Sequence, residues 1–178
     1  KQSKDYSEFD LNIKLPNKKN QLIKKFKIPL LGTHNIKNSV AAAALALTLG
    51  LPIKNIKKGL TNFKGVQRRF NKIFSFNNVD FYDDYAHHPT EIRSILEGVK
   101  NVYSDRRIIS VFEPHRFSRI LSLKREFAKS FFNSDLVLLC PIYAAGEKKR
   151  REFNSLKFAK LISKNSKTQV ILIKSFEE

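Results

Sequence analysis

The sequence predicts an α/β fold that ends in a mainly parallel, doubly wound sheet, and two observations support this class. After Arg69, short apolar runs alternate with helical segments, which is the pattern of strands joined by crossover helices. Before Arg69, the pattern differs, because two strands are followed by two helices. We therefore place a boundary near residues 67–70 and expect one domain piece over residues 1–68 and another over residues 69–178.

The first piece is expected to contain two strands and two helices. Residues 9–15 alternate apolar and polar side chains, which indicates a strand, and residues 22–31 form a second strand after a polar turn. Residues 32–35 open a helix that is rich in Ala over residues 41–49. Because strong helix formers occupy every face of this helix, we expect it to be buried on most sides. A second helix is expected over residues 53–62.

The second piece is expected to begin with a hairpin and to continue as alternating helices and strands. Asn77 and Asn78 form the hairpin turn, since asparagine tolerates positive φ. The expected strands are 70–75, 79–82, 107–112, 136–141 and 169–174, and the expected helices are 88–102, 118–132 and 154–163.

The composition is typical of a soluble globular protein, with 42% hydrophobic and 28% charged residues. The longest apolar run, residues 40–51, is shorter than the roughly 20 residues that cross a bilayer, so no membrane span is expected. The single cysteine, Cys140, excludes an intramolecular disulfide framework and fits a reducing, cytoplasmic location. The first residues lack Met and the apolar core of a signal peptide, so we expect the sequence to continue a longer chain.

The net charge of +18 has two interpretations. Clustered Lys and Arg are typical of nucleic-acid-binding proteins. Here Lys is scattered through every segment except for the run at residues 148–151, and no interleaved aromatic residues offer a platform for bases. We therefore favour a compositional bias and do not expect a nucleic-acid partner, whereas an anionic substrate such as a nucleotide fits either interpretation.

Polar sequence follows three of the predicted strands. These segments are YDDYAHHPTE at 82–91, FEPHRFSR at 112–119 and CPIYAAGE at 140–147. Because ligands of open parallel sheets bind beyond the carboxyl ends of the strands, we expect the three segments to meet at one edge.

The first segment places Asp83 and Asp84 at a strand end and His87 and His88 at a helix start, where anions are attracted. A carboxylate here can hold ribose hydroxyls, and the imidazoles can contact a phosphate or a carboxylate. The same residues are also candidate metal ligands, and a plain helix cap with a solvated turn is the simplest alternative. Two Asp and two His within six positions favour a functional site.

Other candidate residues occur as pairs. Arg116 and Arg119 lie three apart, so on one helix face they can bind an anion together. The alternative, that they are ordinary exposed arginines without a ligand, is equally favoured. Ser118 is a candidate cap for that helix. Asn35 and Asn38 are also three apart and suit an adenine edge, although their spacing alone favours ordinary capping.

Two further observations concern nucleotide binding. Arg68 and Arg69 lie at the predicted boundary, where a nucleotide can be held between two domains, and surface charge is the alternative. No GxxxxGK[ST] phosphate loop occurs in the sequence.

Taken in order, the segments GTHNIKN, GVQRRF, DDYAHHPTEI, EPHRFSR and IYAAGE resemble the Mur ligase family, from about Gly32 to Glu147. The resemblance implies that residues 1–68 end a central ATPase domain and that residues 69–178 form most of a Rossmann-like C-terminal domain, truncated at its end. It also implies an ATP-dependent ligase whose phosphate loop, magnesium ligands and N-terminal domain lie outside this sequence. We therefore expect the chain to be inactive alone.

The resemblance also implies roles for single residues. The implied ATP-binding residues are His34, Asn35, Asn38, Arg69 and Asp84. The implied substrate-binding residues are Tyr85, His87, His88, His115, Arg116 and Arg119, and His87, Arg116 and Arg119 among them are implied to be catalytic.

The implied substrates are UDP-N-acetylmuramate and L-alanine, with ATP and Mg²⁺ as cofactors and the missing N-terminal domains of the same enzyme as partner. No metal site is expected within this sequence. Two alternatives stay open: a basic module on a Mur-like fold that binds nucleic acid or protein, and a small metal-dependent hydrolase that uses Asp83, Asp84, His87 and His88.

Overall fold

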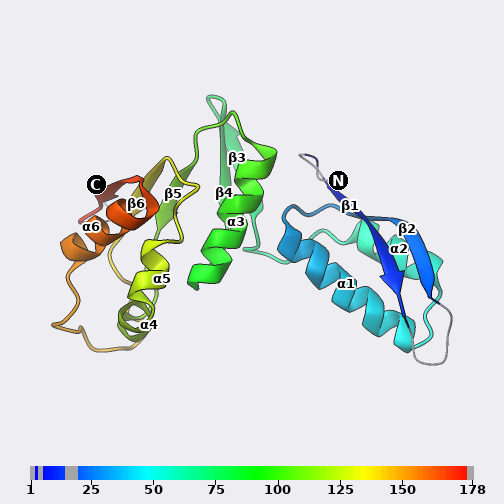
Figure 1. Ribbon diagram of the computed structural model, residues 1–178. Coiled ribbons are helices and arrows are strands. Elements are labelled where there is room, and N and C mark those ends of the chain that lie inside the picture. Colours follow the sequence, from blue (N-terminus) through cyan, green and yellow to red (C-terminus); the bar gives the residue numbers. More distant parts are fainter. Residues whose placement is uncertain (1–2, 4–5, 15–19, 176–178) are drawn as a thin grey trace. The chain divides into compact units, whose positions relative to one another are not determined.

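The computed structural model describes residues 3, 6–14 and 20–175, and the chain divides into two compact units (Figure 1). The first unit contains residues 1–84 and 101–103, and the second contains residues 85–100 and 104–178. Residue 15 of the first predicted strand and most of the polar turn after it lie outside the described residues.

The first unit is built on an antiparallel hairpin covered by two helices (Figure 1). Its elements are β1 (Ser7–Ile13), β2 (Gln21–Ile28), α1 (Thr33–Thr48) and α2 (Ile53–Asn62). Phe9 and Phe26 face each other across the two strands and stack with ring centroids 5.6 Å apart. Phe26 lies in a small apolar core with Leu11, Ile23, Ala43 and Ile56. The predicted strands and helices of this unit are present, and α2 has the predicted bounds.

The Ala-rich helix α1 is much less buried than we predicted. Only Ser39 and Ala43 are buried in it, whereas Leu45 and Leu49 are 63% and 71% exposed. The prediction of burial on most sides is therefore wrong, because the hairpin and α2 cover one side of the helix. Helix propensity reports the conformation of these residues and not what surrounds them.

The first unit also contains a second hairpin, formed by β3 (Asn71–Phe76) and β4 (Val79–Asp83). Its turn residues Asn77 and Asn78 have φ values of 46° and 62°, which confirms the predicted turn with positive φ. Phe74 stacks on Phe81 with ring centroids 4.3 Å apart. Phe74, Phe76, Val79 and Phe81 are all exposed, so this hairpin has an uncovered apolar face.

The second unit contains a parallel sheet, which confirms the predicted fold class. Its strands are β5 (Ile109–Phe112), β6 (Leu136–Leu139) and β7 (Gln169–Leu172), hydrogen-bonded in that order. Its helices are α3 (Pro89–Val102), most of which belongs to this unit, α4 (Phe117–Ser122), α5 (Lys124–Ala128) and α6 (Ser155–Ser166). Figure 1 shows the helices beside the sheet, as expected when each parallel connection must cross over.

One face of this sheet forms the main core of the second unit. Phe112 and Leu139 pack with Phe127, Phe158 and Ile162 of the helices that cross over. The opposite face is exposed at β5, since Ile109 and Val111 are 49% and 69% exposed, whereas Leu136 of β6 is buried on that face. The strict alternation of side chains along a strand produces this difference.

The helix predicted over residues 118–132 is instead two short helices, α4 and α5, so that prediction is wrong. The break is at Leu123, with φ −112° and ψ 26°. The Ser122 hydroxyl donates a hydrogen bond to the Arg119 carbonyl at 3.1 Å, and such side-chain bonds compete with helix hydrogen bonds.

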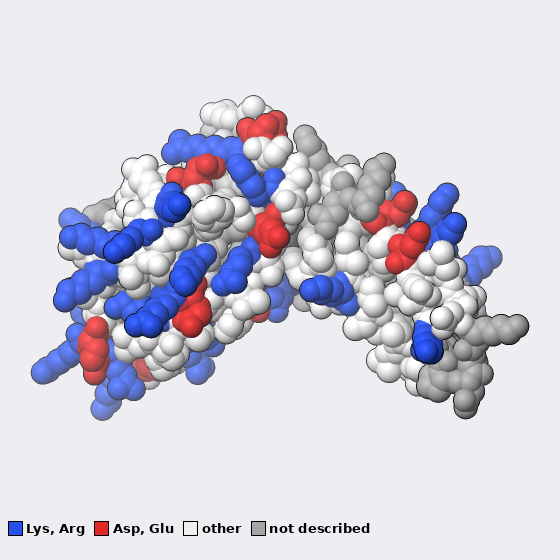
Figure 2. Space-filling model, in the orientation of Figure 1, with Lys and Arg blue, Asp and Glu red and all other residues white. Residues whose placement is uncertain are grey.

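Figure 2 shows Lys and Arg at many places on the visible face, more densely over the second unit than over the first, with a few Asp and Glu among them. The compositional interpretation of the net charge of +18 stays a prediction. Among the described residues, no helix is both long enough and apolar enough to cross a membrane.

Candidate functional site

The five predicted ATP-binding residues all lie in the first unit. His34, Asn35 and Asn38 lie near the start of α1, and Arg69 and Asp84 lie in the chain before and after the second hairpin. Gly32 precedes α1 with φ 90°. A Cβ at this position would lie 2.7 Å from the His34 ring, so only glycine allows the imidazole to fold back over the helix start.

The two asparagines follow the same turn of α1. The Asn35 amide donates a hydrogen bond to the Leu31 carbonyl at 2.7 Å and is half-buried. Asn38 is exposed one turn later. Residues three apart share a helix face, and the role of the two amides in holding one ligand stays a prediction.

A pocket of about 260 Å³ lies next to these residues, and Asn35, Arg69, Phe70 and Tyr82 line it. Phe70 and Tyr82 are stacked with ring centroids 4.3 Å apart. The Asp84 carboxylate accepts a hydrogen bond from the Phe70 backbone N–H at 2.8 Å, which fixes the chain after Arg69. The pocket therefore offers an amide, a cation and a flat apolar wall, which together suit a nucleotide.

The surroundings of the His34 imidazole lower its pKa. Burial lowers its pKa and Arg69 lowers it further, whereas Asp84 raises it. Its buried Nδ1 has no hydrogen-bond partner among the described residues. A buried polar atom of this kind is costly unless a ligand satisfies it.

In the second unit, four rings form a continuous cluster at the end of the parallel sheet: Tyr85, His87, His115 and Tyr143. Their neighbouring centroids are 4.9 Å apart from Tyr85 to His87, 6.3 Å from His87 to His115, and 5.1 Å from His115 to Tyr143.

Backbone hydrogen bonds hold the loops after β5 and β6 together. The Arg116 N–H donates to the Tyr143 carbonyl and the Tyr143 N–H donates to the Pro114 carbonyl, both at 2.9 Å. His115 and Tyr143 thereby extend the parallel pairing beyond the sheet. The expectation that polar segments meet at the carboxyl edge is confirmed for these two loops.

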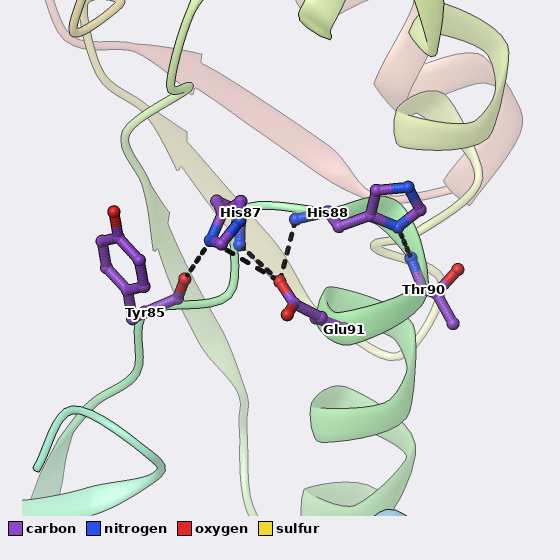
Figure 3. Close-up of polar contacts among 5 residues, drawn as sticks. All are labelled: Tyr85, His87, His88, Thr90 and Glu91. Carbon is purple, nitrogen blue, oxygen red and sulfur yellow. Dashed lines mark hydrogen bonds and ion pairs between the residues drawn. The ribbon is translucent and has the colours of Figure 1, made fainter. Parts of the chain in front are cut away.

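Helix α3 begins with a reciprocal cap that involves both histidines of the first segment (Figure 3). The Glu91 carboxylate accepts hydrogen bonds from the backbone N–H groups of His87 and His88, at 3.0 and 3.1 Å. The His88 Nδ1 accepts from the Thr90 N–H at 3.3 Å. This is a capping box in which histidine takes the place of serine, with Pro89 first in the helix. His88 thus has a structural role, and its substrate contact stays a prediction.

The contacts of His87 determine which ring nitrogen carries hydrogen. Its Nδ1 lies 2.9 Å from the Tyr85 carbonyl oxygen, and a carbonyl only accepts hydrogen bonds, so Nδ1 must be the donor. In the neutral ring, Nε2 therefore carries the lone pair.

Arg116 and Arg119 provide positive charge beside the ring cluster. Arg116 precedes α4 with φ 70°, and one terminal nitrogen of Arg119 is buried without a hydrogen-bond partner among the described residues. Burial lowers the pKa of His115, and Arg119, Arg116 and His87 lower it further, whereas Glu113 raises it. Beyond burial, the charges of Arg119 and Arg116 contribute to this lowered pKa, and these two cations suit an anionic group.

Ser118 does not cap α4, so that prediction is wrong. Its N–H donates to one carboxylate oxygen of Glu147 at 2.9 Å, and its hydroxyl donates to the other. These two hydrogen bonds lower the pKa of Glu147, and the charge of Arg116 adds to the effect. Glu147 thus supplies the anion that the start of α4 favours, and it ties the loop after β6 to that helix.

Comparison with protein families matches residues 68–178 to the family described as Mur ligase, glutamate ligase domain. The chain belongs to the Mur ligase family. The resemblance inferred from the sequence segments is therefore confirmed. Among curated Mur ligases, the UDP-N-acetylmuramate–L-alanine ligase of Pelagibacter ubique is 57% identical over 173 residues, which cover 97% of this chain and 37% of that protein. The ligase of the same name from Brachyspira hyodysenteriae is 48% identical over 123 residues, 69% of this chain and 26% of that protein.

Solved Mur ligase structures have the same fold. The crystal structure of UDP-N-acetylmuramate-alanine ligase from Thermotoga maritima matches with a TM-score of 0.71 and 26% identity, over 96% of this chain and 35% of that one. The chain thus spans about a third of the length of the Mur ligases to which it is similar. The predicted boundary near residues 67–70 stays a prediction, because the family match begins at residue 68 while the first compact unit extends to Asp84.

Sequence reasoning missed Glu91, Tyr143 and Glu147, although all three lie in the segments that we singled out. The spacing of His88 and Glu91 is that of a capping box, so this signal was available. The contacts of Tyr143 and Glu147 depend on loops that are far apart in sequence. No group of three or more His, Cys, Asp or Glu residues that could hold a metal ion occurs among the described residues, and Asp83 pairs with Arg68 at 3.4 Å.

Proposed function

We infer that this chain is the C-terminal part of an enzyme that joins L-alanine to the carboxylate of UDP-N-acetylmuramate in peptidoglycan synthesis. One observation carries the proposal: the cluster of rings and arginines at the sheet edge occurs in a chain that is 57% identical to a ligase of that name. The cluster combines a ring with a hydrogen-bond acceptor at His87 and two cations at Arg116 and Arg119. The attacking amine of L-alanine needs a hydrogen-bond acceptor, and the negatively charged reacting centre needs cations.

The residues of the first unit fit a bound ATP molecule. The pocket beside Asn35 offers an amide for the base, Arg69 a charge for the phosphates, and His34 a buried ring nitrogen with no hydrogen-bond partner among the described residues. When bound, ATP supplies the phosphoryl group that activates the substrate carboxylate as an acyl phosphate. We place the ligands of the accompanying Mg²⁺ in the part of the enzyme that precedes this chain.

Arg116 and Arg119 stabilise negative charge as the amine adds to the activated carbonyl carbon and phosphate leaves. His87 accepts a hydrogen bond from the attacking amine through the lone pair on Nε2. The amine loses one proton in forming the amide bond, and the adjacent imidazole is suited to receive it. Exclusion of water by the remaining domains protects the acyl phosphate from hydrolysis.

The N-terminal and central domains of the same enzyme are the partner that this proposal requires. The expected location is the cytoplasm, which agrees with a single, buried free cysteine. The chain alone is expected to be inactive, because the phosphate loop does not occur in its sequence.

The test is a chimera that joins the N-terminal part of the Pelagibacter ligase to this chain at the matched position. Phosphate release is measured with ATP, UDP-N-acetylmuramate and L-alanine, each omitted in turn. We expect release only with all three substrates and only from the chimera, and loss of release in the Arg119→Ala chimera. A folded chimera that is inactive with all three substrates would contradict the proposal.

A further inference from the structure

We propose that Glu91 is a positioning residue for His87, holding its imidazole in the orientation and tautomer that present Nε2 to the acceptor amine. The part that concerns amine binding rests on the proposed function. The part that concerns ring orientation rests only on contacts within the second unit.

The argument begins with the backbone. Glu91 accepts hydrogen bonds from two successive N–H groups, those of His87 and His88 (Figure 3). The His87 N–H belongs to the peptide plane before His87 and the His88 N–H to the plane after it, so the two bonds to one carboxylate oxygen fix both planes that flank the His87 Cα. Together these two planes determine the direction in which the His87 side chain leaves the backbone.

The second step concerns the ring itself. The His87 Nδ1 lies 2.9 Å from the Tyr85 carbonyl oxygen and 3.7 Å from the Glu91 carboxylate oxygen. Both neighbours are acceptors, and both therefore favour a hydrogen on Nδ1. The hydrogen bond made by one ring nitrogen determines the state of the other, so these two contacts together leave Nε2 as the lone-pair nitrogen.

A purely structural explanation is that Glu91 only caps α3. The chain offers variants that separate the two roles. His88→Ser keeps a good N-cap residue and leaves Glu91 in place. The double variant His88→Ser with Glu91→Ala keeps the serine cap and removes the carboxylate. Glu91→Gln keeps an acceptor oxygen, as in capping boxes that use glutamine. Glu97→Ala removes an exposed carboxylate from the same helix and is the matched control.

The experiment is an NMR measurement on the full chain, labelled with ¹⁵N, about two pH units above the ordinary histidine pKa of about 6.5, where the rings are neutral. Long-range ¹H–¹⁵N correlations assign the tautomer of each imidazole. We expect His87 to be the Nδ1–H tautomer in the unmodified chain, in His88→Ser, in Glu91→Gln and in Glu97→Ala. We expect a mixture of both tautomers in Glu91→Ala and in the double variant, with α3 amides still protected from exchange.

If His87 keeps the Nδ1–H tautomer in the folded double variant, the Tyr85 carbonyl alone sets the ring and the proposal is wrong. The functional part is tested by Glu91→Ala in the active chimera, where turnover should fall by at least about tenfold, by analogy with the loss of a residue that orients a metal-ligating histidine. Full turnover with a lost tautomer would overturn that part. An inactive unmodified chimera would count against the proposed function only, because the NMR result does not depend on it.

Discussion

Arg116 has a backbone conformation that few side chains adopt, with φ 70° and ψ 128°. Non-glycine residues in such regions cost of order 1–3 kcal/mol and persist where the surroundings determine them. Here the surroundings are two backbone hydrogen bonds between the loops after β5 and β6. The strain therefore belongs to the same arrangement that places two cations beside the ring cluster.

This strain leads to a prediction about two substitutions at one position. Arg116→Ala and Arg116→Gly both remove the cation, but only glycine relieves the positive φ. We expect Arg116→Gly to be more stable than Arg116→Ala by about 1 kcal/mol, measured from urea unfolding followed by circular dichroism. Equal midpoints for the two variants would mean that the backbone is not strained, and both chimeras should be inactive.

Glu147 leads to a prediction about acid. Its pKa is lowered in the folded chain by the two hydrogen bonds from Ser118, so the unfolded chain binds the proton more readily. The stabilisation is therefore present above the ordinary pKa of 4.5 and is lost as the pH falls through the lower folded value. We expect Ser118→Ala to flatten the fall of the urea midpoint below this pH. The control is Ser122→Ala, which should keep the slope of the unmodified chain.

At the scale of helices and strands, sequence patterns predicted an element correctly where its conformation depends only on residues close to it in sequence. The sequence predicted α2 and the Asn77–Asn78 turn correctly because spacing and turn chemistry are local. It failed for α1, whose burial depends on what surrounds it, and for the break at Leu123, which no Gly or Pro marks. The same limit applies to the site, since Tyr143 and Glu147 act through loops distant in sequence.

Helix α6 offers a test of local capping. The Asn154 side chain accepts a hydrogen bond from the Lys157 N–H at 2.9 Å, and the helix buries Phe158 and Ile162 in the main core. We expect Asn154→Ala to lower the free energy of unfolding by about 1 kcal/mol. Asn154→Asp should retain the stability, because it keeps the acceptor and adds a favourable charge at the helix start. No loss in the alanine variant would show that the α6 cap is unimportant.

At the scale of the whole molecule, net charge and exposed apolar surface have opposite effects on the association of copies of the chain. The chain has a net charge of +18, which resists association of copies. Each unit also exposes large apolar side chains, including Phe76 at 65% and Val111 at 69%. Contiguous apolar patches of this kind promote association when nothing covers them.

We therefore expect the chain to be monomeric at low salt and to associate as salt increases. The screening length falls from about 10 Å at 0.1 M to about 3 Å at 1 M, so repulsion weakens while apolar attraction remains. Sedimentation equilibrium across this range should show a rising average mass. Phe76→Thr and Val111→Thr, which keep β-propensity, should each reduce the rise. A mass that instead falls with salt would mean that oppositely charged surfaces hold the copies together, because only attraction between opposite charges weakens under screening.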